Sequence, residues 1–110
     1  MADTTNLRTG ISDLVNDLVK ILNNTTHAEQ QTALQKIINA LMILWQQVIF
    51  DQLNQQSSDY QAAIASLKEA QEAAGQAKTD LDNVALAIGK ATTAAKAVDK
   101  VIKFAVKLLV

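Results

Sequence analysis

The chain has 110 residues, 49% of them apolar, with three glycines and neither proline nor cysteine. Without cysteine there is no disulfide framework, no thiolate metal site and no thiol nucleophile. So few turn-forming residues exclude a β-protein rich in tight turns, and so many apolar residues exclude a disordered chain. Residues 1–110 are therefore predicted to form a single all-α domain with an aliphatic core.

The net charge of −1 conceals an uneven distribution along the chain. Residues 1–82 hold ten acidic and five basic side chains, a net charge of −5, whereas residues 83–110 hold five lysines and one aspartate, a net charge of +4. Such a separation of charge can orient self-assembly or steer one end toward an anionic surface. The alternative interpretation is a solvated lysine face that keeps an apolar helix soluble.

The first predicted helix covers residues 5–23. Its apolar residues form one stripe with a period of about 3.6 residues. They are Leu7, Ile11, Leu14, Val15, Leu18, Val19, Ile21 and Leu22. The short polar side chains of residues 23–26 compete for backbone hydrogen bonds and predict a turn.

The second predicted helix covers residues 26–55 and begins with a capping box formed by Thr26 and Glu29. Between residues 37 and 50 its apolar side chains cover nearly the whole circumference, and such a helix must be covered on most sides. The run is shorter than the roughly 20 residues that span a bilayer. It is therefore predicted to be a central core helix or, as the alternative, an oligomer interface. The residues that carry this prediction are Ile38, Leu41, Leu44, Trp45 and Val48.

The third predicted segment, residues 58–109, has the clearest pattern. Every position reached by alternating steps of three and four residues from Tyr60 is apolar, which indicates a continuous heptad seam. The seam residues other than alanine are Tyr60, Leu67, Leu81, Val84, Ile88, Val98, Ile102 and Leu109. Because its alanines bury little area, this seam is predicted to pack against the bulky 37–50 segment.

Two architectures fit that register. The favoured one is a single helix over 58–109, because a turn would interrupt a register that continues on both sides. In the other, the segment breaks near 75–80 and gives helices over 58–74 and 80–109, with Thr79 or Asp80 as a cap. Both predict an all-α bundle of three to four long antiparallel helices with coiled-coil-like heptad packing.

The C-terminal part of this segment, residues 84–110, is cationic and amphipathic. Four lysines spaced by four, three and four residues lie on one helix stripe, at Lys96, Lys100, Lys103 and Lys107. They are candidate contacts to an anionic membrane surface. Because no arginine or stacking aromatic accompanies them, they do not indicate nucleic-acid binding.

The sequence contains no pattern of residues that is typical of a catalytic or cofactor-binding site. His27 is the only histidine, and no metal-ligand spacing or glycine-rich phosphate loop occurs. We therefore predict no catalytic, cofactor-binding or metal site, and no enzyme. The N-terminus lacks the basic start and apolar run of a secretory signal, which predicts cytoplasmic residence or export without a cleaved signal peptide.

Three functional hypotheses follow. The first is a non-catalytic protein that acts by helix–helix association, as a homo-oligomer or with a helical protein partner. The alternative is a membrane-active protein that uses residues 84–110 to bind or permeabilise anionic membranes. The third is a monomeric bundle that binds a small apolar ligand between its helices.

Overall fold

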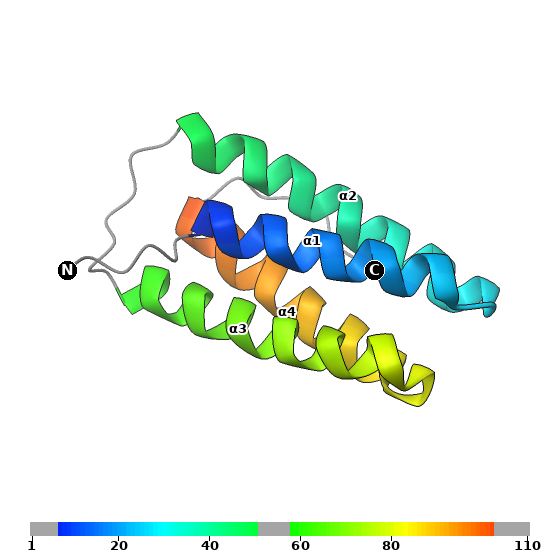
Figure 1. Ribbon diagram of the computed structural model, residues 1–110. Helices are drawn as coiled ribbons and strands as arrows, with labels where there is room; N and C mark the ends of the chain where they lie inside the picture. The colour runs from blue at the N-terminus through cyan, green and yellow to red at the C-terminus, as the bar shows by residue number, and fades with distance from the viewer. Residues whose placement is uncertain (1–6, 51–57, 103–110) are drawn as a thin grey trace.

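The computed structural model describes residues 7–50 and 58–102, and it is an all-α bundle of four packed helices (Figure 1). The predicted all-α bundle is confirmed, and its coiled-coil-like heptad packing stays a prediction. The helices are α1 (Leu7–Asn24), α2 (Ala28–Phe50), α3 (Ser58–Thr79) and α4 (Val84–Ile102), and a short 3-10 turn, η1 (Leu81–Asn83), precedes α4.

The four helices form a ring in the order α1, α2, α4, α3. Extensive contacts join α1 to α2, α2 to α4, α4 to α3 and α3 to α1, while α1 and α4 meet only weakly across the diagonal. Consecutive helices run in opposite directions, as predicted, so α1–α2 and α3–α4 are antiparallel hairpins (Figure 1).

The two hairpins pack side by side with α1 parallel to α3, which the prediction of antiparallel neighbours did not include. Three hydrogen bonds show this parallel direction, because their order along α1 follows their order along α3. They join Leu7 N to Tyr60 Oη, Gln71 Nε2 to Gly10 O, and Lys78 Nζ to Asp17 Oδ1. The two helices approach closely at Gly10, where a Cβ atom would lie 3.0 Å from Leu67 Cδ1. The neighbour relation is therefore antiparallel within hairpins and parallel between them.

The favoured continuous helix over 58–109 is wrong. The helix runs through Gly75 and ends at Thr79, whose hydroxyl donates to the Gln76 carbonyl at 3.1 Å. The Asp80 carboxylate then accepts the Asp82 backbone N–H at 3.0 Å, which satisfies an amide at the start of the next turn. Folding back at Asp80 lets the seam residues before and after the turn cover one another instead of facing water.

The turn between α1 and α2 is held by Thr25, not by the predicted box of Thr26 and Glu29. Thr25 is buried, its hydroxyl donates to Gln30 Oε1 at 2.8 Å, and its carbonyl accepts from Gln31 Nε2 at 2.9 Å. This network starts α2 at Ala28, two residues later than predicted.

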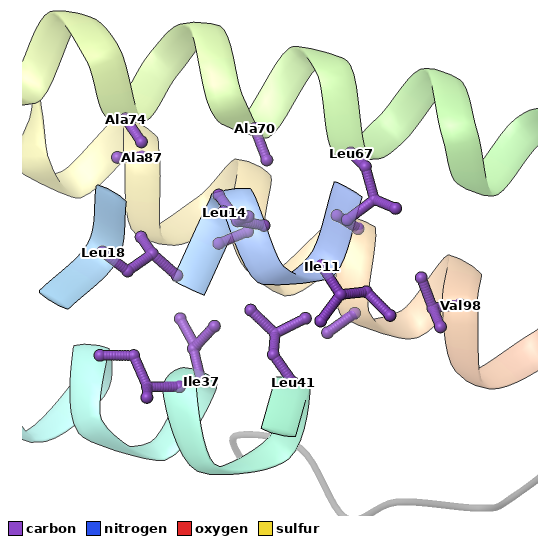
Figure 2. Packing of buried hydrophobic residues seen from close by; sticks show 14 of the residues in the cluster. Ile11, Leu14, Leu18, Ile37, Leu41, Leu67, Ala70, Ala74, Ala87 and Val98 are labelled. Atoms are coloured by element: carbon purple, nitrogen blue, oxygen red, sulfur yellow. The ribbon is translucent and has the colours of Figure 1, made fainter. Parts of the chain in front are cut away.

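The core lies between the hairpins, which contribute different side chains (Figure 2). The α1–α2 hairpin supplies large aliphatic residues: Leu7, Ile11, Leu14, Leu18, Ile21, Leu34, Ile37, Ile38, Leu41 and Leu44. The α3–α4 hairpin supplies mainly alanine: Ala63, Ala70, Ala73, Ala74, Ala77, Ala87, Ala91, Ala94 and Ala95. The expected packing of a small-residue seam against the bulky 37–50 segment is therefore present for α4, which contacts α2, whereas α3 packs against α1.

Candidate interaction surface

The apolar circumference of α2 predicted a helix that is covered on most sides, but the structure leaves one side of α2 exposed. Ile38, Leu41 and Leu44 are buried, but Met42 and Ile43 are 49% and 44% exposed. In a ring of four helices each helix has an outer side, so none can be central. Packing in the core of this chain therefore does not explain the exposed apolar side chains of α2.

A shallow apolar groove lies on the outer side of the bundle between α1 and α2. It has a volume of about 220 Å³. Ile11, Ser12, Val15 and Asn16 of α1 line it together with Met42 and Trp45 of α2. Ser12 and Asn16 are four residues apart on one helix face, and their short side chains leave the groove hollow. Val19, one turn further along this face, is 36% exposed.

Trp45 lines the groove and is half-buried. The guanidinium carbon of Arg8 lies 5.3 Å from the centroid of its ring, within the range of a cation–π interaction. Arg8 and Trp45 also line a second hollow together with Ser12, which adjoins the groove.

We define the α1–α2 surface as the groove, its neighbour Val19 and the polar side chains beside them: Arg8, Ser12, Val15, Asn16, Val19, Gln35, Asn39, Met42 and Trp45. Gln35 borders the same helix pair at Leu22, and it donates a 3.1 Å hydrogen bond to Asn39 Oδ1. Arg8 is the charged member of this set, and two other charges border it: Asp13 lines a second hollow with Arg8, Ser12 and Trp45, and Lys36 lines a hollow with Gln35. Protein interfaces share this composition, with aromatic, methionine and arginine side chains and few other charges.

The residues predicted for the seam lie at different depths. Tyr60, Leu67, Val84 and Val98 are buried, and Ile88 and Ile102 are partly buried against the core. Leu81 lies in η1, but its side chain is outside the described residues, as is Leu109. Among the other predicted residues of α2, Trp45 and Val48 are partly buried and pack on the core from its edge.

The predicted lysine stripe is only half described. Lys96 and Lys100 are exposed on α4, and Lys103 and Lys107 lie outside the described residues. Lys100 Nζ lies 3.5 Å from Asp59 Oδ1, so this lysine forms an ion pair between α4 and α3.

Sequence reasoning missed the α1 half of the surface, including Arg8, Ser12 and Asn16. The stripe of α1 placed Val15 and Val19 among the core residues, although they lie at its edge. A usable signal was the scarcity of charge in the second helix, where Lys36 is the only ionised side chain between residues 30 and 50. Uncharged outer positions beside exposed apolar ones are typical of an interface.

In the part of the chain that the structure describes, no group of three or more histidine, cysteine, aspartate or glutamate residues could hold a metal ion. No helix among the described residues is long and apolar enough to cross a membrane. Comparison with protein-family models, curated proteins and solved structures finds no match.

Proposed function

We propose that this protein is non-catalytic and acts by helix–helix association, and that it associates through the α1–α2 surface. One observation carries the proposal. The four helices close a core, yet Val19, Met42 and Trp45 remain at least partly outside it, on a surface that contains one charge, Arg8, and has Asp13 and Lys36 at its borders. Exposed apolar groups of this kind are covered when a second protein surface packs on them.

The membrane-active alternative has less support. The apolar side of α4 is buried in the core, including Val84, Ala91 and Val98. Lys100 is paired with Asp59 across the hairpin. Contact of this apolar side with lipid would require α4 to leave the bundle. We expect no dye leakage from anionic vesicles, and leakage that is lost when Lys96 and Lys100 are changed to alanine would favour the membrane hypothesis instead.

Binding of a small apolar ligand also has less support. The apolar groove of about 220 Å³ is smaller than typical ligand pockets of roughly 300–1,000 Å³, and it is shallow. A larger hollow of about 450 Å³ between α1 and α2 has one apolar lining residue, Leu22, beside polar and charged side chains, which does not suit an apolar ligand. A shallow, open apolar groove suits the side chains of another helix better than an enclosed ligand.

The oxidation rate of Met42 tests the proposal. Met42 is 49% exposed, so dilute peroxide should convert it to the sulfoxide in the purified protein at low concentration. We expect the rate to fall in concentrated protein or in a lysate of the cells that make it, because a partner covers the side chain. Mass spectrometry of the full chain measures both conditions.

The variant Leu86→Met supplies the matched control. Leu86 is 48% exposed on α4, outside the α1–α2 surface, and the exchange nearly conserves volume. The methionine introduced there should oxidise at the same rate in every condition. If Met42 shows no more protection than this reference in either concentrated protein or lysate, the proposed function is wrong.

A further inference from the structure

We propose that the partner on the α1–α2 surface is a second copy of this chain, packed with its α1 antiparallel to α1 of the first. This inference rests on the proposed function, because it takes the same surface as the place of association. It adds the occupant and its orientation.

The shape of the surface fits a copy of itself. Val19 is partly exposed, and the hollow of the groove lies beside Ser12, seven residues earlier on the same side of α1. In an antiparallel pair related by a two-fold axis near residues 15 and 16, position 12 of one copy lies opposite position 19 of the other. Each Val19 would then enter the hollow of the opposite copy, which makes a closed and self-complementary interface.

The charge of the surface selects the antiparallel orientation. Arg8 lies at the N-terminal end of α1, and the antiparallel pair places the two Arg8 side chains at opposite ends of the interface. Each would face the C-terminal end of the other α1, near Asn23 and Asn24, where the helix dipole carries partial negative charge. A parallel pair would instead bring both Arg8 side chains to the same end.

The remaining polar groups allow the surface to face a copy of itself. Ser12, Asn16, Gln35 and Asn39 carry hydroxyl or amide groups that both donate and accept hydrogen bonds. Such groups can pair with their own kind without the repulsion that like charges produce. A strongly charged partner would find no row of opposite charges on this surface.

Sedimentation of the purified full chain at increasing concentration tests the occupant. We expect the average molar mass to rise from 11.9 kDa toward twice this value. Val19→Lys should keep the single-chain mass at all concentrations, because a charge would enter the interface. Leu86→Lys, a matched change on the outer side of α4, should associate like the unchanged protein, and circular dichroism shows that both variants remain helical.

Disulfide formation tests the orientation. The chain contains no cysteine, so each variant carries one thiol. In a mixture of Ser12→Cys and Val19→Cys proteins, the mixed disulfide should form faster than either symmetric one, because the antiparallel pair joins position 12 to position 19. Faster formation of the symmetric Ser12→Cys dimer would overturn the antiparallel arrangement. Thr93→Cys, on the exposed side of α4, gives the rate of random collision.

The contribution of Arg8 to the pair can be measured as a change in the dissociation constant. Arg8→Ala should raise the dissociation constant of the pair by about tenfold, since two symmetric contacts are lost. Lys20→Ala removes a charge from the same helix outside the defined surface, and it should leave the constant unchanged.

The outcomes separate this inference from the proposed function. A purified chain that stays at its single-chain mass, with cysteine variants that cross-link only at the collision rate, overturns the second copy as the partner. If Met42 is nevertheless protected in lysate, the proposed function stands with a different partner. If Met42 is protected nowhere, both proposals are wrong.

Discussion

Helices α1 and α2 bring leucine and isoleucine to the core, whereas α3 and α4 bring mainly alanine. Burial of a large aliphatic side chain contributes about 1.5–3 kcal/mol, and alanine contributes less because it removes less apolar area from water. The α1–α2 hairpin therefore supplies most of the apolar area that holds the bundle together. The alanines of the other hairpin supply close approach between helices.

The outer sides of the two hairpins differ in the opposite sense. The α3–α4 hairpin carries charges on its surface, with ion pairs between Lys90 and Glu69 and between Lys100 and Asp59. The α1–α2 hairpin also carries exposed charges, at Asp13, Lys20, Glu29 and Lys36, but the α1–α2 surface itself includes only Arg8. The hairpin that contributes more to the core is thus also the one that carries the proposed association surface.

The largest expected effect is the loss of a bulky core side chain in the first hairpin. Leu41→Ala leaves a cavity at a fully buried position, and we expect the free energy of unfolding to fall by about 2–5 kcal/mol. Urea unfolding followed by circular dichroism measures this change. Met42→Ala, at the neighbouring exposed position, should change the same free energy by less than about 1 kcal/mol. Equal losses at both positions would contradict the assigned inner and outer sides of α2.

The opposite change, a larger side chain in the alanine seam, should destabilise the α3–α4 hairpin. Ala74 is fully buried in the alanine seam, and Ala74→Leu adds volume where no space remains, which should lower the free energy of unfolding by roughly 1–3 kcal/mol. Ala62→Leu, on the exposed side of the same helix, is the control and should be nearly neutral. A stabilising effect of Ala74→Leu would show that the seam contains unfilled space.

The two hairpins were not equally predictable from the sequence. The period of apolar residues in α1 identifies buried residues such as Leu14, because burial of one stripe follows from helix geometry. In α2 nearly the whole circumference is apolar between residues 37 and 50, so the sequence does not separate the buried Leu41 from the exposed Met42. The same period could not locate the turn at Asp80. An antiparallel hairpin returns the seam to the same core, so an unbroken register fits a continuous helix and a folded pair equally well.

The relation between the hairpins and the α1–α2 surface depends on tertiary packing. The parallel contact of α1 with α3 is fixed by Gly10 against Leu67 and by the pairing of Asp17 with Lys78, residues about 60 positions apart. No local pattern encodes such a contact. Likewise, Met42 is apolar like its neighbours, and only the ring of four helices determines that its side chain remains outside.

Two glycines test how closely individual helices pack against their neighbours. A Cβ atom at Gly75 would meet nothing within 4 Å, so Gly75→Ala should raise the free energy of unfolding by about 1 kcal/mol through helix propensity alone. Gly10→Ala should gain less, because its Cβ would lie 3.0 Å from the buried Leu67 and that side chain must move. Thermal or urea unfolding of the two variants measures the difference. Equal gains would show that α1 and α3 are not closely packed at Gly10.

The smallest expected effect concerns the ion pair that joins the two hairpins. Lys78 Nζ lies 2.9 Å from Asp17 Oδ1, and these side chains are 33% and 22% exposed, whereas those of Lys100 and Asp59 are 74% and 46% exposed at 3.5 Å. Solvent screens the outer pair more strongly, so a double-mutant cycle should give a coupling of about 0.5–1 kcal/mol for Asp17 with Lys78 and nearly none for Asp59 with Lys100. The neutral exchanges Asp17→Asn and Lys78→Met, set against Asp59→Asn and Lys100→Met, make the two cycles comparable. Added salt should reduce the inner coupling only partly, because partial burial limits screening. If both couplings were equal, this pair would not help to fix α1 beside α3, and the parallel contact between hairpins would rest on apolar packing at Gly10 and Leu67.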